Sequence, residues 1–198
     1  VGIDMVAGPS EIVVVADNRN EPHIIAADLL SQAEHDPTSQ SILFTDDGDF
    51  ADAVAAAVAY LIPTLNTAST MQESWAGNGA VIIVPTLADA IPLCDRLAPE
   101  HLELAVDLAE ADALFAKVRH AGSVFLGRQT PEAIGDYVAG SNHVLPTARS
   151  ARFSSGLGVL DFMKRTAILK CGPDQLAELG PAAIALAEAE GLAAHARS

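Results

Sequence analysis

The sequence predicts an α/β protein: a Rossmann-like layered parallel sheet flanked by helices, with a small C-terminal extension. Several short runs consist almost entirely of branched apolar residues, a pattern typical of strands that are buried on both faces of a parallel sheet. Segments with helical spacing separate these runs, and parallel strands require such crossover connections. With 198 residues, of which 50% are hydrophobic, the chain is long enough to bury a sizeable core.

The predicted strands begin at residues 11–16 (EIVVVA), a continuous β-branched run. Asn20 and Pro22 supply N-cap and first-turn signals for a helix that continues to about His35 and is stopped by Pro37. About five strands are expected in all, and the remaining predicted elements are strands at 41–45, 80–84, 102–106 and 121–126 and helices at 48–62, 86–96 and 108–119.

The regular alternation ends after Thr130, where glycines and prolines divide the chain into short segments. A strand-like run follows at residues 167–170, and an alanine-rich helix is predicted from Pro181 to about His195. We place a domain boundary near Ser155, which gives a Rossmann-like portion at residues 1–155 and a small extension at 156–198. The extension is too thin to bury a core of its own, so it is expected to pack on another chain or domain.

Charge is unevenly distributed along the chain. Up to residue 95 one basic residue, Arg19, stands against 14 acidic ones, and from Arg96 onward 10 basic residues stand against 12 acidic ones. Neither half offers the basic surface that nucleic-acid binding requires, and anionic membranes are disfavoured for the same reason. The longest apolar run, residues 53–62, is too short to cross a bilayer.

The two cysteines, Cys94 and Cys171, cannot form a disulfide framework or a cysteine-based zinc site by themselves, so a reducing cytosol is the expected compartment. No signal peptide is visible, and the chain opens without methionine, as an excised piece of a longer protein would. Cys94 lies in a helical pattern and is expected to be a buried core thiol. A cysteine-nucleophile aldehyde dehydrogenase is therefore unsupported, and no glycine-rich dinucleotide fingerprint follows a strand.

Gln32 and His35 are the first candidate site residues. They are three positions apart near a helix end and so share one face. They could form half of a metal site, with the His nitrogen and the Gln carbonyl oxygen as ligands. Alternatively, they are only a polar helix end at which a His complements the dipole.

Glu100 and His101 are the second candidates. In a proline-led loop before a strand, both side chains can reach one pocket. One could activate water while the other transfers a proton near neutral pH. A solvated turn explains the same letters.

The other candidate positions are weaker when each is taken alone. Asp136 and His143 stand among small residues, which suits either a site with close backbone approach or a tight turn. Ser10 could present its hydroxyl to a ligand or belong to a turn. Glu190 and His195 are five apart on the predicted terminal helix, which could equally be a solvent-facing polar stripe.

Six blocks taken together resemble the histidinol dehydrogenase family, in the right order and over the full length of the chain. They are AGPSE at residues 7–11, ADLLSQAEHD at 27–36, LAPEHLE at 97–103, GDYVAG at 135–140, NHVLPT at 142–147, and RFSSGL at 152–157 with the downstream DFMKR at 161–165. The resemblance implies a zinc-dependent cytosolic enzyme of histidine biosynthesis, which oxidises L-histidinol through the aldehyde to L-histidine with two NAD molecules.

The resemblance also assigns roles to the candidates by position. It implies that Gln32, His35, Asp136 and His195 are zinc ligands and that these side chains also contact the substrate. His101 resembles the base that takes the hydroxyl proton, and Glu100 resembles the group that activates the water that adds to the aldehyde. Ser10 and Glu190 resemble substrate contacts. His143 is expected to line the pocket, with no role assigned.

A homodimer is implied, in which His195 and Glu190 reach the site of the other copy and give the extension at 156–198 its dimerisation and active-site role. Histidinol dehydrogenases are much longer than this chain, which resembles their C-terminal half, so the NAD-binding positions are expected upstream of Val1.

The first hypothesis is therefore the zinc- and substrate-binding part of a histidinol dehydrogenase. The second is a zinc-binding, dimerising fragment that is catalytically incomplete without the NAD-binding part, and the third is a generic metal-dependent hydrolase, which the family blocks disfavour.

Overall fold

A computed structural model of the chain describes residues 8–198. Val1–Ala7 lie outside the described residues, and with them the first residue of the AGPSE block and the start of the predicted first domain. The chain divides into two compact units, one up to Asp161 and one at Phe162–Ser198, and each is described here by itself.

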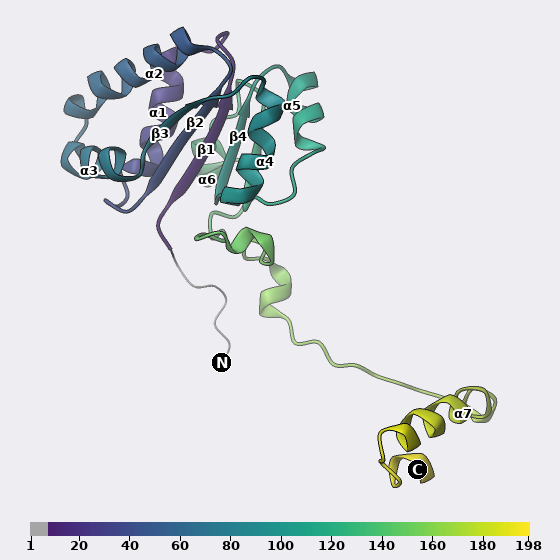
Figure 1. Cartoon of the computed structure of the whole chain (residues 1–198). Coiled ribbons are helices and arrows are strands. Elements are labelled where there is room, and N and C mark those ends of the chain that lie inside the picture. The colour runs from purple at the N-terminus through teal and green to yellow at the C-terminus, as the bar shows by residue number, and fades with distance from the viewer. Residues whose placement is uncertain (1–7) are drawn as a thin grey trace. The chain divides into compact units, whose positions relative to one another are not determined.

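The first unit is built on a sheet of five parallel strands (Figure 1). The strands are β1 (Glu11–Ala16), β2 (Gln40–Thr45), β3 (Ala80–Ile83), β4 (His101–Ala105) and β5 (Ser123–Leu126). Their spatial order is β3-β2-β1-β4-β5, the order of a Rossmann-type half sheet. β2 and β3 are added on one side of β1, and β4 and β5 on the other. The predicted α/β fold class is confirmed, with the five strands within one or two residues of their expected positions.

Helices cover both faces of the sheet, as Figure 1 shows. On one face, Ile12 and Val14 contribute to a core with α1 (Pro22–Ala33), α2 (Gly48–Leu61) and α3 (Ala68–Asn78). On the other, Val13 and Val15 pack with α4 (Leu87–Leu97) and α5 (Leu108–Phe115). This alternation explains why β1 is apolar at nearly every position. A short helix, α6 (Glu132–Tyr137), contacts α1.

Two helices of the first unit were not predicted. The α3 segment is largely polar and buries only Met71 and Ser74, so it lacks a continuous apolar stripe. The α6 segment is only 6 residues long and buries Glu132 and Gly135, which is not an amphipathic pattern. Both depend on tertiary packing more than on local sequence.

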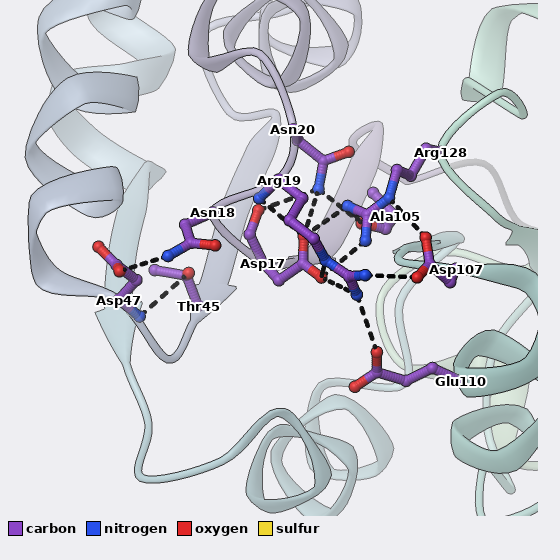
Figure 2. A network of polar contacts seen from close by, with 10 residues as sticks. All are labelled: Asp17, Asn18, Arg19, Asn20, Thr45, Asp47, Ala105, Asp107, Glu110 and Arg128. Atoms are coloured by element: carbon purple, nitrogen blue, oxygen red, sulfur yellow. Dashed lines mark hydrogen bonds and ion pairs between the residues drawn. The ribbon is translucent and has the colours of Figure 1, made fainter.

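A polar network closes the carboxyl edge of the sheet, where β1, β4 and β5 end (Figure 2). The Asp17 carboxylate, which follows β1, lies between the guanidinium groups of Arg19 and Arg128. Both arginines also bind Asp107, which follows β4. Since Asp17 and Arg128 keep only 12% and 16% of their side-chain surface exposed, this network fixes the positions of three strand ends and fills the edge between β1 and β4.

The second unit contains one long helix, α7 (Pro173–Ala189), and a short helix at His195–Arg197. The predicted helix at 181–195 is misplaced, because Pro173 begins α7 earlier and Gly191, with φ of 76°, ends it before His195. The predicted strand at 167–170 is wrong, since that run has no strand partner among the described residues.

No residue of the second unit is buried within the chain, and the apolar side chains of Ile168, Leu169 and Leu186 are largely exposed. The expectation that this part cannot form a core by itself is consistent with that exposure. The functional division at residue 155 stays a prediction.

Among residues 8–198, no helix is both long and apolar enough to cross a membrane. Cys94 is fully buried in α4, as predicted, and burial raises the pKa of its thiol to about 12. Because this thiol stays protonated near neutral pH, it is unsuited to act as a nucleophile.

Candidate active site

A cavity of about 360 Å³ lies at the amino edge of the sheet, where β1 and β4 begin. Six residues predicted for the site line it: Ser10, Gln32, His35, Glu100, His101 and Asp136. His143, which was predicted to line the pocket, and Tyr137, which was not, complete the wall. Segments that are far apart in the chain thus converge on one space. At the carboxyl edge, where ligands bind in most open α/β sheets, the Asp17 network lies between the ends of β1 and β4. A cavity of about 300 Å³ lies beside it, lined by residues that follow β4 and β5.

Gln32 and His35 reach the cavity from the end of α1. The helix ends at Ala33, so His35 lies in the following turn, where its backbone N–H donates to the Gln32 carbonyl at 3.2 Å. Gln32 is buried and His35 is exposed. Their three-residue spacing places both side chains on the cavity, as the sequence predicted, although one of them stands beyond the helix.

Glu100 and His101 are positioned by the way that the chain leaves α4. Ala98 ends that helix in the left-handed region, with φ of 48°, and Pro99 then directs the chain back toward the sheet. The carbonyls of Pro99 and Glu100 accept hydrogen bonds from Gly122 and Ser123 at 2.9 and 2.8 Å. Both site residues therefore lie on fixed backbone at the start of β4.

The hydrogen bonding of His101 defines its tautomer. Nδ1 lies 3.0 Å from the backbone carbonyl oxygen of Glu11, which can only accept, so Nδ1 carries the proton. Nε2 is buried, has no hydrogen-bond partner, and lies 3.6 Å from Asp136 Oδ1 and 3.7 Å from Glu132 Oε1. The neutral ring therefore offers an unprotonated nitrogen beside two carboxyl groups, as a general base requires.

Burial controls the electrostatics of this pair. It lowers the pKa of His101, against the opposing effects of the Glu11 carbonyl and Asp136, and so favours the neutral base. Burial also raises the pKa of Glu100 to about 7, helped by the nearby carboxylates, although the Glu11 N–H opposes the shift. A carboxyl group that titrates near neutral pH can both accept and return a proton.

Glu132, in α6, was missed by the sequence reasoning. It is only 2% exposed, accepts a hydrogen bond from Ser31 Oγ at 3.0 Å, and burial raises the pKa of its carboxyl to about 7. His101, Glu132 and Asp136 can bring one ligand atom each within 4.8 Å of one another. A glutamate directly after a proline is typical of a surface helix start, and its burial arises only because α6 packs on α1.

Glu103, two residues beyond His101 on β4, was also missed. Its carboxyl is 2% exposed, and one of its oxygens has no hydrogen-bond partner. Burial raises the pKa of Glu103 well above its ordinary value, with Asp28 and Glu132 adding to the shift. An acidic residue inside an otherwise apolar strand was the available sequence signal.

The Glu103→Gln variant is expected to be more stable than the parent at pH 8. Because the folded-state pKa of Glu103 is raised, the carboxyl favours folding below its unfolded pKa, near 4.5, and loses that contribution as pH rises. The amide does not ionise, so we expect a gain of roughly 1 kcal/mol or more in unfolding free energy at pH 8. Urea unfolding at several pH values measures this, and equal stabilities at pH 8 would contradict it.

The other predicted site residues are placed as follows. Ser10 and His143 lie on the cavity wall, and Tyr137, which sequence reasoning did not single out, lies beside them. Glu190 caps the end of α7 and His195 begins the short terminal helix, both in the second unit, so their part in the site stays a prediction.

A neutral imidazole with a free nitrogen, a buried carboxyl group and several nitrogen and oxygen donors on one cavity define a site for acid–base chemistry, with donors that suit a metal ion. The profile of the family described as histidinol dehydrogenase matches residues 1–198. The chain belongs to the histidinol dehydrogenase family.

Individual relatives agree with this assignment. The chain is 65% identical over 198 residues to the histidinol dehydrogenases of Rhizobium meliloti and Zymomonas mobilis, and it covers 45% and 46% of their lengths. The crystal structure of histidinol dehydrogenase from Elizabethkingia anophelis matches with a TM-score of 0.93 and 38% identity, over 100% of this chain and 45% of that one. The chain thus spans somewhat less than half the length of the relatives that it matches.

Proposed function

We propose that this chain is the zinc- and substrate-binding part of an enzyme that oxidises L-histidinol through L-histidinal to L-histidine with NAD, in histidine biosynthesis. The observation that carries the proposal is the free Nε2 of His101, held in one cavity with Glu100. Family membership supports the choice of substrate.

In the first oxidation, His101 Nε2 takes the proton of the substrate hydroxyl. The imidazolium that forms lies 3.6 and 3.7 Å from the Asp136 and Glu132 carboxyl oxygens, which stabilise its charge. In the second oxidation, the Glu100 carboxylate takes a proton from the water that adds to the aldehyde carbon. Its pKa of about 7 suits this task near neutral pH.

The donors on the cavity fit a zinc ion. In this proposal, Gln32 offers its amide oxygen, His35 a ring nitrogen and Asp136 a carboxylate oxygen, with His195 of a second copy as the fourth ligand. A bound zinc ion would bind the imidazole and the amine of the substrate and so orient its alcohol. His101 stays outside this ligand set, because its Nε2 is needed for the proton.

The described residues do not fit NAD at the place where a Rossmann-type sheet usually binds it. The loop after β1, residues 17–20, contains no glycine, and its Asp17 is bound to Arg128 and Arg19. The loop therefore lacks the glycine-rich backbone that lets a diphosphate approach closely, and its Asp17 side chain is already committed to ion pairs. We therefore expect the coenzyme contacts outside this chain and assign no step of NAD chemistry to its residues.

A second candidate is a zinc-binding, dimerising fragment that is catalytically incomplete. The observation that favours it is coverage, since the chain matches only 45% of the length of its relatives. The two candidates share the site and differ in whether turnover occurs without further sequence.

Zinc content and NAD-dependent histidinol oxidation, measured on one sample of the 198-residue chain, distinguish the candidates. About one zinc per chain without turnover supports the fragment, whereas turnover by a longer protein that carries this chain supports the enzyme. Absence of zinc and of turnover in that longer protein would refute both.

Mixed dimers test the proposed contribution of His195 to the other copy. We expect His35→Ala and His195→Ala homodimers to be inactive, because each lacks a ligand at every site. A heterodimer of the two variants should regain about one intact site, or roughly half the activity of the parent dimer. Activity after subunit exchange measures this, and complete inactivity of purified heterodimers would place His195 in the site of its own copy.

A further inference from the structure

Glu11, the first residue of β1, is buried next to the cavity but does not line it. Its carboxylate accepts two backbone hydrogen bonds: from the N–H of Glu100 at 3.2 Å and from the N–H of Ala148 at 3.0 Å. The two donors belong to segments almost fifty residues apart. One carboxylate therefore joins the start of β4 to the chain at residue 148.

The backbone of Glu11 contacts the same pair of site residues. Its N–H donates to the Glu100 carboxylate at 3.1 Å, and its carbonyl accepts from His101 Nδ1 at 3.0 Å. Glu11 and Glu100 thus exchange bonds, each carboxylate accepting the backbone N–H of the other. This exchange fixes the Glu100 side chain, and the carbonyl bond sets the tautomer that leaves His101 Nε2 free.

The segment at residue 148 needs such an anchor. Ala148 and Arg149 both adopt the left-handed region, with φ of 51° and 66°, which is unfavourable for residues other than glycine. The bond from Ala148 N–H to Glu11 Oε1 holds this turn, and the Arg149 guanidinium is close enough to attract the Glu11 carboxylate.

Only an ionised carboxyl group suits both N–H donors. A glutamine has one oxygen, so its NH₂ group would face the second backbone N–H and leave it without an acceptor. Burying a carboxylate costs free energy, and burial accordingly raises the pKa of Glu11. If packing were the only role of this position, a neutral residue would fill it equally well without that cost.

Building on the proposed function, we propose that Glu11 is a positioning residue for both proton-transfer steps. Its carboxylate holds the backbone of Glu100 and the turn at Ala148 against the start of β1. It thereby keeps the Glu11 backbone N–H and carbonyl in reach of the Glu100 carboxylate and of His101 Nδ1, the bonds that orient Glu100 and set the His101 tautomer. It does not touch the substrate.

The test compares Glu11→Gln with Glu21→Gln in a histidinol dehydrogenase that carries this chain at its full natural length. Glu21 is exposed and its side chain makes no capping bond, so it is the matched control. We expect Glu11→Gln to lower kcat about 10- to 100-fold for both histidinol and histidinal, with KM changed less than about threefold and zinc content unchanged. A lower melting temperature with unchanged kcat would show a merely structural role and overturn the proposal.

A spectroscopic measurement separates this proposal from the proposed function. In ¹⁵N spectra of the imidazoles, the parent is expected to show His101 with Nδ1 protonated. Glu11→Gln keeps the backbone carbonyl at residue 11 but holds the start of β4 less firmly, so the bond from Nδ1 to that carbonyl should weaken and mixed tautomers are expected. Unchanged His101 signals would overturn the positioning role, even if the parent proved inactive on histidinol and the proposed function failed. Should Glu11→Gln not fold, Glu11→Asp keeps the charge but shortens its reach, and normal kcat in that variant would also overturn the proposal.

Discussion

The His101→Asn variant is expected to lose the oxidation of histidinol while it keeps its zinc. The asparagine amide can still donate to the Glu11 carbonyl, as Nδ1 does now at 3.0 Å, so the start of β4 should keep its conformation. What disappears is Nε2, the unpartnered nitrogen in the cavity. Loss of a general base typically costs about 10²–10⁴-fold, and we expect roughly 10³-fold in kcat.

The companion variant His35→Ala is expected to lose its zinc together with its turnover. Zinc content by elemental analysis and turnover at saturating histidinol, measured on both variants, give the comparison. His23→Asn is the matched control, because His23 is exposed on α1 and should affect neither quantity.

Loss of zinc in His101→Asn would contradict the proposed division of roles. It would indicate that the ion is held by His101, Glu132 and Asp136, whose ligand atoms can come within 4.8 Å of one another. The free Nε2 would then be a ligand, and another group would have to take the hydroxyl proton.

The sequence predicted the sheet well because its strands carry strong local signals. β1 is fully buried, so it needs apolar residues on both faces, and this requirement is visible in EIVVVA. The run at 167–170 has similar composition and forms no strand, because a strand also needs a neighbour with which to pair. Composition shows which segments can be strands, whereas pairing is a property of the whole fold.

The candidate site was predictable where the chain places its residues close together. Gln32 and His35, or Glu100 and His101, are near neighbours in sequence, and the family resemblance added Asp136. Glu11, Glu103 and Glu132 could not be found in this way, since their importance lies in burial and in contacts to distant segments. Glu11, for example, bonds to a backbone N–H 137 residues away.

The Glu100→Gln variant is expected to separate the two oxidation steps. The amide can still accept the Glu11 N–H bond, now 3.1 Å long, but it cannot take a proton from water. Aldehyde oxidation should therefore fall by roughly 10³-fold, while oxidation of the alcohol, which relies on His101, falls by no more than about 10-fold.

The measurement is NADH formation from histidinol and from histidinal, each as a separate substrate. Glu103→Gln is the matched control, since Glu103 is another buried glutamate of β4 but lies away from the cavity lining, so it should keep the ratio of the two rates. If Glu100→Gln lowers both rates equally, Glu100 does not act on the water, and its raised pKa has no part in the second step. A selective loss of the second step would instead assign the two proton transfers to two adjacent residues. His101 acts as a base because its tautomer leaves Nε2 unprotonated, and Glu100 acts as a base near neutral pH because burial raises its pKa to about 7.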